Sequence, residues 1–149
     1  MITKMDSMDK ARFSELISYH RTVRFRGIKR VIDNEIVAMV GFDDWTPNSV
    51  QMHVWSSRGL SRDFISECFR YAFSYVGIAF TTVRCNNTAS LELTRRLGFR
   101  QILIVKDGYA LGTDLAIQEM RREECRWIRQ EVPKWAEKQI LHKYPTTTG

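Results

Sequence analysis

The stretch that decides the fold is Val83-Arg-Cys-Asn-Asn-Thr-Ala-Ser-Leu-Glu-Leu-Thr-Arg-Arg-Leu-Gly-Phe99. Asn87 is a residue type that caps helices, and Gly98 stands where helices commonly end in the left-handed conformation. Between them, apolar residues recur at the spacing of one helix face: Ala89, Leu93 and Leu97. The β-branched run 78–85 before this helix and the run 99–105 after it predict strands.

Towards the N-terminus the pattern predicts a helix over about residues 12–22, capped by Asp9. Its apolar face consists of Phe13, Leu16, Ile17, His20 and Val23. Three strands follow at 28–33, 36–45 and 49–55, and the turns Asn34-Glu35 and Thr46-Pro47-Asn48 between them indicate an antiparallel meander. Ser61 then caps the clearest helix, which ends at Gly77 and has one apolar face: Phe64, Ile65, Cys68, Phe69, Ala72, Phe73 and Val76.

Towards the C-terminus the pattern predicts a loop at 106–112, a strand at 113–120 and a helix over 121–131 that Pro133 interrupts. The fold class is therefore α/β, or an α+β sandwich, with a mixed sheet, helices on both faces and a C-terminal helical extension. We expect one domain over residues 1–120, with the extension 121–149 packed on it.

The composition is that of a soluble globular protein of 149 residues, with 44% hydrophobic and 27% charged residues. No apolar run approaches the roughly 18 to 20 residues of a membrane helix, and the polar start is not a secretory signal. The three cysteines, Cys68, Cys85 and Cys125, form no CxxC pair. This pattern predicts a reduced, cytoplasmic chain with buried cysteines and without a metal site.

The net charge is +6, which suits either nucleic acid or a polyanionic cofactor such as CoA. Four arginines lie on the predicted C-terminal helix: Arg121, Arg122, Arg126 and Arg129. They share it with Glu123, Glu124 and Glu131, so ion pairs on a solvated face explain them equally well. Because no nucleic-acid motif accompanies the charge, we do not expect nucleic acid as the partner.

The spacing of Asn87, Ser90, Leu97, Gly98 and Phe99 after a strand resembles the GNAT (GCN5-related N-acetyltransferase) superfamily. The order of the predicted elements up to about residue 120 is similar to that family as well. The resemblance implies a GNAT-like, mostly antiparallel sheet and a domain that binds acyl-CoA. It also implies an enzyme, an acyltransferase that transfers an acetyl group from acetyl-CoA to an amine.

In that family the fourth and fifth strands splay apart, and their free backbone groups bind the pantetheine arm of the cofactor. The resemblance assigns this role to residues on both sides of the gap and at the start of the following helix: Val54, Trp55, Val83, Arg84, Asn87 and Ser90. The family's pyrophosphate loop corresponds to residues 56–63. Arg58 and Gly59 match it, while Ser61 and Asp63 stand where small glycines are usual. Arg62 adds compensating charge. The alternative is an ordinary capped helix with solvated arginines.

The reaction needs a general acid for the leaving thiolate and a general base for the amine. Many relatives have a tyrosine at the position of Thr94, whose hydroxyl is a far poorer acid. Tyr109 and Tyr75 are possible substitutes. His53, on the predicted fourth strand, is the candidate base. Weaker options for the base are Asp43, Asp44 and Glu119, which could equally attract a cationic amine.

Two further runs, residues 44–54 and 121–127, resemble small GNAT-like proteins encoded by tailed bacteriophages. This resemblance implies residence in the host cytoplasm or the virion. It also leaves open a catalytically inactive virion or DNA-ejection protein, which Thr94 and the altered loop favour. The acceptor, a small-molecule or protein amine, has no signature in the sequence. Trp127 and Trp135 could cover a homodimer face or fold back on the domain.

Overall fold

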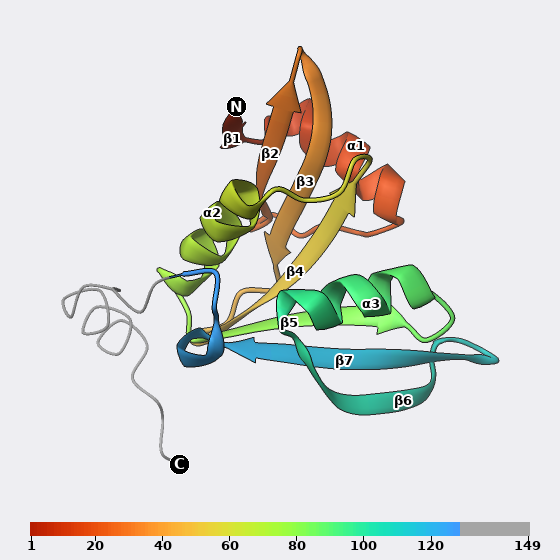
Figure 1. Ribbon diagram of the computed structural model, residues 1–149. Coiled ribbons are helices and arrows are strands. Elements are labelled where there is room, and N and C mark those ends of the chain that lie inside the picture. Colours follow the sequence, from red (N-terminus) through yellow and green to blue (C-terminus); the bar gives the residue numbers. More distant parts are fainter. Residues whose placement is uncertain (129–149) are drawn as a thin grey trace.

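The computed structural model describes residues 1–128, which form one seven-stranded sheet flanked by three α-helices (Figure 1). The strands are β1 (Ile2–Lys4), β2 (Arg26–Ile32), β3 (Glu35–Asp43), β4 (Ser49–Ser56), β5 (Ile78–Arg84), β6 (Arg100–Ala110) and β7 (Thr113–Arg121). The helices are α1 (Ser7–Ile17), α2 (Arg62–Phe73) and α3 (Thr88–Leu97), and a 3-10 turn, η1, covers Arg122–Glu124.

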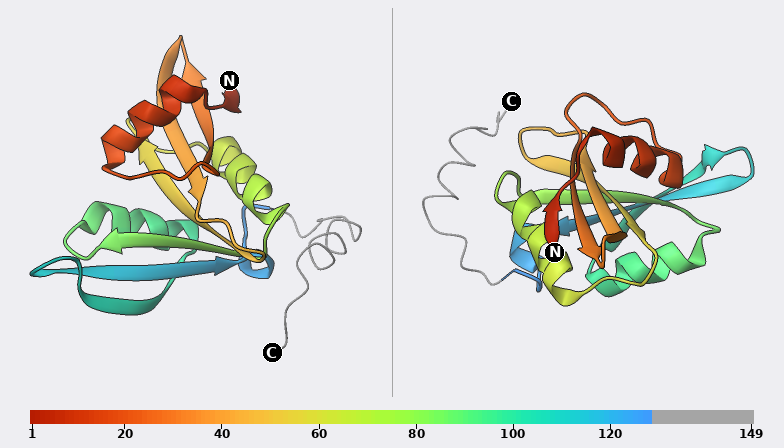
Figure 2. Two further views of the ribbon diagram at one scale, coloured as in Figure 1. Left: turned by 180° about the vertical axis from the view of Figure 1, so that it is seen from behind. Right: turned by 90° about the horizontal axis from the view of Figure 1, so that it is seen from above.

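The strand order in the sheet is β1-β2-β3-β4-β5-β7-β6. Neighbouring strands are antiparallel except β4 and β5, which are parallel. The predicted fold class, a mixed and mostly antiparallel sheet with helices on both faces, is confirmed. Figure 2 shows α1 on one face, and α2 and α3 on the other.

Side chains alternate along β3 and β4, so each face of the sheet has its own core. Val40 and Phe42 of β3, with Val50 and Met52 of β4, pack against the apolar stripe of α2. On the opposite face, Met39 packs with Met5, Phe13 and Phe25 beneath α1. The strands that carry the site are therefore held from both sides.

Gly41 sets how closely α1 approaches the sheet. A methyl group at Gly41 would lie 2.4 Å from Phe25 Cζ and 2.7 Å from Phe13 Cε1, and both rings are fully or nearly fully buried. The absence of a side chain therefore leaves the space that these two rings fill. The end of α1 and the loop after it are positioned by this contact.

Three predicted helix boundaries are confirmed. The Ser61 side chain caps α2 by accepting a hydrogen bond from the Phe64 N–H, at 3.2 Å. The Asn87 side chain caps α3 in the same way through the Ser90 N–H, at 3.1 Å. Gly98 ends α3 with a φ of 107°, the left-handed conformation expected of it.

The predicted first helix is wrong at both ends. Asp6, not Asp9, is the N-cap, and the two aspartates bond each other's backbone N–H in a capping box. The helix ends at Ile17 because Ser18 adopts the left-handed conformation, with φ 52°. Consequently Val23, expected on the buried face, is 99% exposed.

Two turns were also misplaced in the prediction. The first hairpin turns at Asp33 and Asn34, which both have positive φ, so Glu35 already belongs to β3. The expected loop 106–112 is largely strand, because β6 continues to Ala110 through a bulge after Val105. Asp107 stabilises that bulge by accepting a hydrogen bond from the Gly112 N–H, at 2.9 Å.

The predicted helix from residue 121 does not form in the described chain. Arg121 still belongs to β7, and η1 ends at Glu124. Residues 125–128 instead pack onto the core. The Trp127 indole N–H donates a hydrogen bond to the Leu97 carbonyl at 2.7 Å, and Cys125 and Ile128 are buried. Residues 129–149, with Arg129, Pro133 and Trp135, lie outside the described residues. Within residues 1–128 no helix has the length and apolarity needed to span a membrane.

The contact at Gly41 gives a stability prediction. Gly41→Ala should lower the free energy of unfolding by about 1–3 kcal/mol, because the buried Phe13 and Phe25 rings have little room to move. Phe25→Leu makes room for the new methyl group. Gly41→Ala should therefore cost less free energy of unfolding in the Phe25→Leu background than in the unaltered chain. Urea unfolding of the two single variants and the double variant measures both values. Strictly additive effects would contradict this account of the contact.

Candidate active site

The site begins where β4 and β5 separate. They pair only through Ser49–Ile78, Val50–Ala79 and Gln51–Phe80, and the Gln51 side-chain N–H donates to the Thr82 hydroxyl at 3.0 Å just beyond. The strands then diverge as the two arms of a V (Figure 1). Along the remainder of both strands, backbone N–H and C=O groups that face the gap have no partner strand in the described chain. Such groups can bind an extended ligand as they would bind a strand.

A cavity of about 400 Å³ occupies this gap. It opens to both faces of the sheet, because successive residues of a strand point to opposite faces. On the α1 face it is lined by the end of α1 and by side chains of β4 to β7: Ile17, Tyr19, His53, Thr82, Arg84, Tyr109 and Leu115. On the α3 face it is lined by Val54, Val83, Asn87, Ser90, Leu93 and Thr94.

The structure brings seven of the predicted site residues together in this cavity: His53, Val54, Val83, Arg84, Asn87, Ser90 and Thr94. The other four lie elsewhere. Trp55 packs against the core beneath α1 and does not line the cavity. Arg58, Gly59 and Arg62 lie on the loop and helix that follow β4 and do not line the cavity.

The loop after β4 differs from a simple phosphate cradle. Arg58 pairs with Glu35 at 2.8 Å on the exposed end of the first hairpin. Gly59 has a φ of 77°, with open space where a side chain would be. Arg62 lies 6.0 Å from the centre of the Trp127 ring. Asp63 lines a separate cavity with Met1, Ile2 and Arg30.

Thr94 lines the cavity, but its hydroxyl is committed to its own helix. Its single proton is shared between the carbonyls of Ser90, at 3.0 Å, and Leu91, at 3.1 Å. A threonine in this back-bonded state has no hydrogen left to give to a leaving group. Of the two phenols that the sequence offered as substitutes, Tyr109 lines the cavity, while Tyr75 packs against Trp45 at a ring distance of 5.8 Å.

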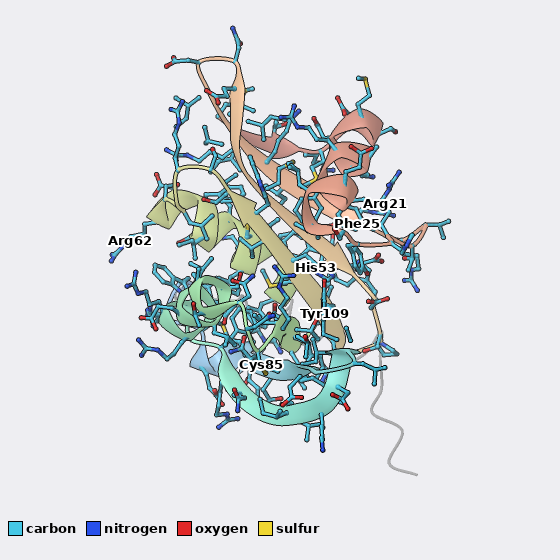
Figure 3. All side chains as sticks on the ribbon, turned by 90° about the vertical axis from the view of Figure 1, so that its right-hand side faces the viewer. Arg21, Phe25, His53, Arg62, Cys85 and Tyr109 are labelled. Atoms are coloured by element: carbon cyan, nitrogen blue, oxygen red, sulfur yellow. The ribbon has the colours of Figure 1, made fainter. Side chains whose placement is uncertain are left out.

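His53 lies in the middle of the gap, facing the viewer in Figure 3. Its ring contacts the Tyr19 ring, with 4.0 Å between centroids, and its buried Nε2 has no hydrogen-bond partner. Burial lowers the pKa of His53 to about 4, although the nearby charges of Asp44 and Asp43 act in the opposite direction. At neutral pH the imidazole is therefore uncharged, and one of its two ring nitrogens carries no proton.

A hydrogen-bond network that the sequence reasoning missed holds Tyr19 against His53. The Tyr19 hydroxyl contacts one carboxylate oxygen each of Asp43 and Asp44, both at 3.1 Å. Asp43 is fully buried and also accepts hydrogen bonds from the Thr22 N–H and hydroxyl. Burial alone would raise the pKa of Asp43, but the bonds from Thr22 outweigh it, and the pKa lies below its ordinary value. The carboxylate thus anchors the loop after α1.

The sequence offered only one clue to this network, the aspartate at the end of an apolar strand. Tyr19 could not be found from spacing, because its role depends on where the loop after α1 returns to the sheet. Burial, followed by the charge on Asp43 and the bonds to both aspartates, raises the pKa of Tyr19. The Tyr19 hydroxyl is therefore a weak proton donor. Its bonds to the two aspartates hold the Tyr19 ring beside His53.

Arg84 and Tyr109 complete the α1 side of the cavity. The Arg84 guanidinium carbon lies 5.5 Å from the centre of the Tyr109 ring, within the range of a cation–π contact. Figure 3 shows Tyr109 below His53, on the opposite side of the gap. The described residues contain no group of three or more His, Cys, Asp or Glu side chains arranged to hold a metal ion.

Solved structures with the same architecture are acetyltransferases. The ribosomal-protein-S18-alanine N-acetyltransferase from Escherichia coli is 14% identical, with a TM-score of 0.64 over 81% of this chain and 92% of that one. The spermidine N-acetyltransferase from Vibrio cholerae, solved with CoA and spermine, is 11% identical, with a TM-score of 0.68 over 83% and 96%.

A protein from Desulfovibrio desulfuricans described as a GNAT-family acetyltransferase is 11% identical, with a TM-score of 0.65 over 81% of this chain and 98% of that one. No family model matches the sequence, and no curated protein matches it significantly. The chain therefore has the fold of the GNAT acetyltransferases.

Proposed function

We propose that this protein is an N-acetyltransferase that transfers an acetyl group from acetyl-CoA to an amine. The observation that carries the proposal is the cavity through the sheet between β4 and β5. It offers free backbone groups to an extended arm and an uncharged imidazole nitrogen to an amine. Its volume of about 400 Å³ suits a small ligand rather than a solvent channel.

The α3 side of the gap would hold the pantetheine arm. Backbone groups of Val54 and Val83 border the gap, and each hydrogen bond to the arm would contribute about 0.5–1.5 kcal/mol. The Asn87 oxygen already caps α3, so its amide N–H groups are the part available to a ligand. Ser90 and Leu93 form the wall beyond it.

The start of α2 would hold the diphosphate. The Ser61 side chain satisfies only the Phe64 N–H, so the first N–H groups of α2 are open to an anion. Arg62 adds positive charge there. Arg58 could join it, because its exposed ion pair with Glu35 is worth at most about 1 kcal/mol. Asp63, which stands where a small glycine is usual in the family, lies in the first turn of α2 and lines a cavity together with Ser61.

The chemistry on the α1 side follows from His53. Acetyl-CoA would supply an acyl group activated as a thioester. The amine nitrogen forms a bond to the carbonyl carbon as the carbon–sulfur bond breaks, and the imidazole of His53 accepts the proton that the nitrogen loses. The charges of Asp44 and Asp43 offset part of the cost that burial imposes on the resulting imidazolium. Because the Thr94 proton is engaged, the thiolate would take its proton from water or from Tyr109.

Binding of the acyl donor is the first test. Acetyl-CoA at 100 times its dissociation constant should raise the free energy of unfolding by about 2.7 kcal/mol, which a thermal melt detects. Ser90→Phe should abolish the shift, because the new ring enters the gap. Ala89→Phe is the matched control: it is exposed on the same helix, outside the cavity, and should keep the shift. No shift for the unaltered chain would contradict the proposal.

The role of His53 gives an activity prediction. His53→Gln should lower kcat by roughly 10²–10⁴-fold, the usual contribution of a general base, with the affinity for acetyl-CoA unchanged. Steady-state kinetics and a binding titration separate the two effects. Unchanged turnover would remove His53 from the mechanism and leave the donor site intact.

The same residue gives a prediction that does not depend on activity. The folded-state pKa of His53, about 4, lies below its ordinary 6.5, so the unfolded chain binds an extra proton between these values. Stability from this group is therefore present above pH 6.5 and is lost as the pH falls towards 4. Urea midpoints of the unaltered chain should fall more steeply over this window than those of His53→Gln. His20→Gln, at an exposed histidine, should retain the steep fall.

A second candidate, a GNAT-shaped phage virion or DNA-ejection protein without catalysis, is favoured by one observation. The Thr94 hydroxyl is bonded within α3 and has no proton for the leaving group. This candidate predicts no acetyl-CoA binding, no CoA release with any amine, and the chain in purified virions. Two arginines near the end of the described chain already have partners within the protein. Arg121 pairs with Glu119 at 3.6 Å, and Arg126 donates a hydrogen bond to the Arg96 carbonyl.

A further inference from the structure

Arg84 is the charged residue of the cavity. Of the described side chains that line it, Arg84 alone carries a full charge at neutral pH, since His53 is uncharged. Within residues 1–128 Arg84 forms no hydrogen bond and no ion pair with an acidic group, and its contact is the Tyr109 ring. The guanidinium therefore stands at the cavity without a carboxylate partner among the described residues.

The position of Arg84 relative to His53 follows from strand register. Gln51 and Thr82 bond each other across the closed end of the V, on the α1 face. His53 and Arg84 are each two residues further along their strands, about 7 Å, and so point to the same face. They therefore stand on opposite arms of the V, one with a free nitrogen and the other with a free positive charge.

We propose that the acceptor is a primary amine that also carries a carboxylate, such as a free amino acid, and that Arg84 binds this carboxylate. This assignment rests on the proposed acetyltransferase function. The amine would lie beside His53, and the carboxylate would bond the guanidinium across the gap. No acidic side chain among the described residues lines the cavity, so a polycation would meet the positive charge of Arg84 in its wall and no carboxylate to bind there.

Tyr109 positions the guanidinium for this contact. Its ring is 52% exposed and lies against Arg84, which restricts the otherwise free side chain at little cost in burial. The bulge after Val105 places Tyr109 at the cavity, and Asp107 holds that bulge. In binding of the carboxylate, Tyr109 is thus a positioning residue that acts through Arg84, whatever the source of the proton for the thiolate.

The anion could instead be a phosphate of the acyl donor. The geometry favours the acceptor, because Arg84 is on the α1 face with His53, whereas the pantetheine wall of Asn87, Ser90 and Leu93 is on the α3 face. The two sources predict different kinetics. A carboxylate contact affects only acceptors that have the carboxylate, while a phosphate contact changes the KM of acetyl-CoA with every acceptor.

The experiment measures kcat/KM for matched acceptor pairs that differ only in the carboxylate: L-lysine and cadaverine, L-ornithine and putrescine, L-phenylalanine and phenethylamine. The unaltered chain should prefer the member with the carboxylate by roughly 10- to 100-fold, the range of a hydrogen-bonded charge pair. Arg84→Gln should remove this preference and leave both the decarboxylated acceptors and the KM of acetyl-CoA unchanged. Tyr109→Phe should retain the preference, and Tyr109→Leu should weaken it.

Arg12→Gln is the matched control, because Arg12 is exposed on α1 outside the cavity and the variant loses the same charge. Equal or better turnover of the decarboxylated members would overturn the assignment while leaving acetyl transfer intact. A raised KM for acetyl-CoA in Arg84→Gln with every acceptor would overturn it in favour of a phosphate. Absence of both turnover and acetyl-CoA binding would overturn the proposed function, and this assignment with it.

Discussion

The short parallel pairing of β4 and β5 is the constraint on which the rest of the structure depends. Three residue pairs join the two halves of the sheet. In contrast, β4 is bound to β3 along six pairs and β5 to β7 along seven. Each half is therefore a stiff antiparallel ladder. The width of the gap between β4 and β5 is set by the relative position of these two ladders. A row of free backbone groups inside the fold favours a ligand that completes the missing pairing.

The two faces of the gap differ chemically, and the difference arises from a single buried carboxylate. Asp43 binds Thr22 and Tyr19, so the loop after α1 closes over the α1 face and brings the Tyr19 ring against His53. The imidazole is thereby kept from water and stays neutral. The α3 face offers Val54, Val83 and Leu93 together with the side chains of Asn87 and Ser90. A partly apolar wall on one side and an imidazole on the other suit an acyl donor and an amine acceptor that approach from opposite faces.

Local signals in the sequence predicted the fold well, because helix-capping residues and the spacing of apolar residues identify helices and strands. Ser61 caps the start of α2 and Asn87 the start of α3, and Gly98 ends α3 in the left-handed conformation. The prediction was wrong where tertiary bonds override periodicity. Ser18 breaks the first helix so that Tyr19 and Thr22 can reach Asp43, and Trp127 bonds the Leu97 carbonyl where a helix was expected.

The site was predictable only in part, for the same reason. Residues on the two diverging strands and on α3 could be placed from the order of the elements, and His53, Val83, Asn87 and Ser90 do line one cavity. Tyr19 could not be placed, because it reaches the cavity through a loop conformation. The packing of Trp55 beneath α1 outside the cavity, and the engagement of the Thr94 hydroxyl within its helix, also require three-dimensional information.

Hydrogen–deuterium exchange of the backbone, with and without acetyl-CoA, tests the central claim that the gap completes its pairing with an acyl donor. If an acyl donor completes the pairing, exchange should slow in peptides that cover residues 52–56 of β4 and 81–87 after the start of β5. Exchange in β2, which lies on the far side of β3, should not change. Unchanged exchange along both arms of the V at saturating acetyl-CoA, or slowing confined to another part of the chain, would contradict it.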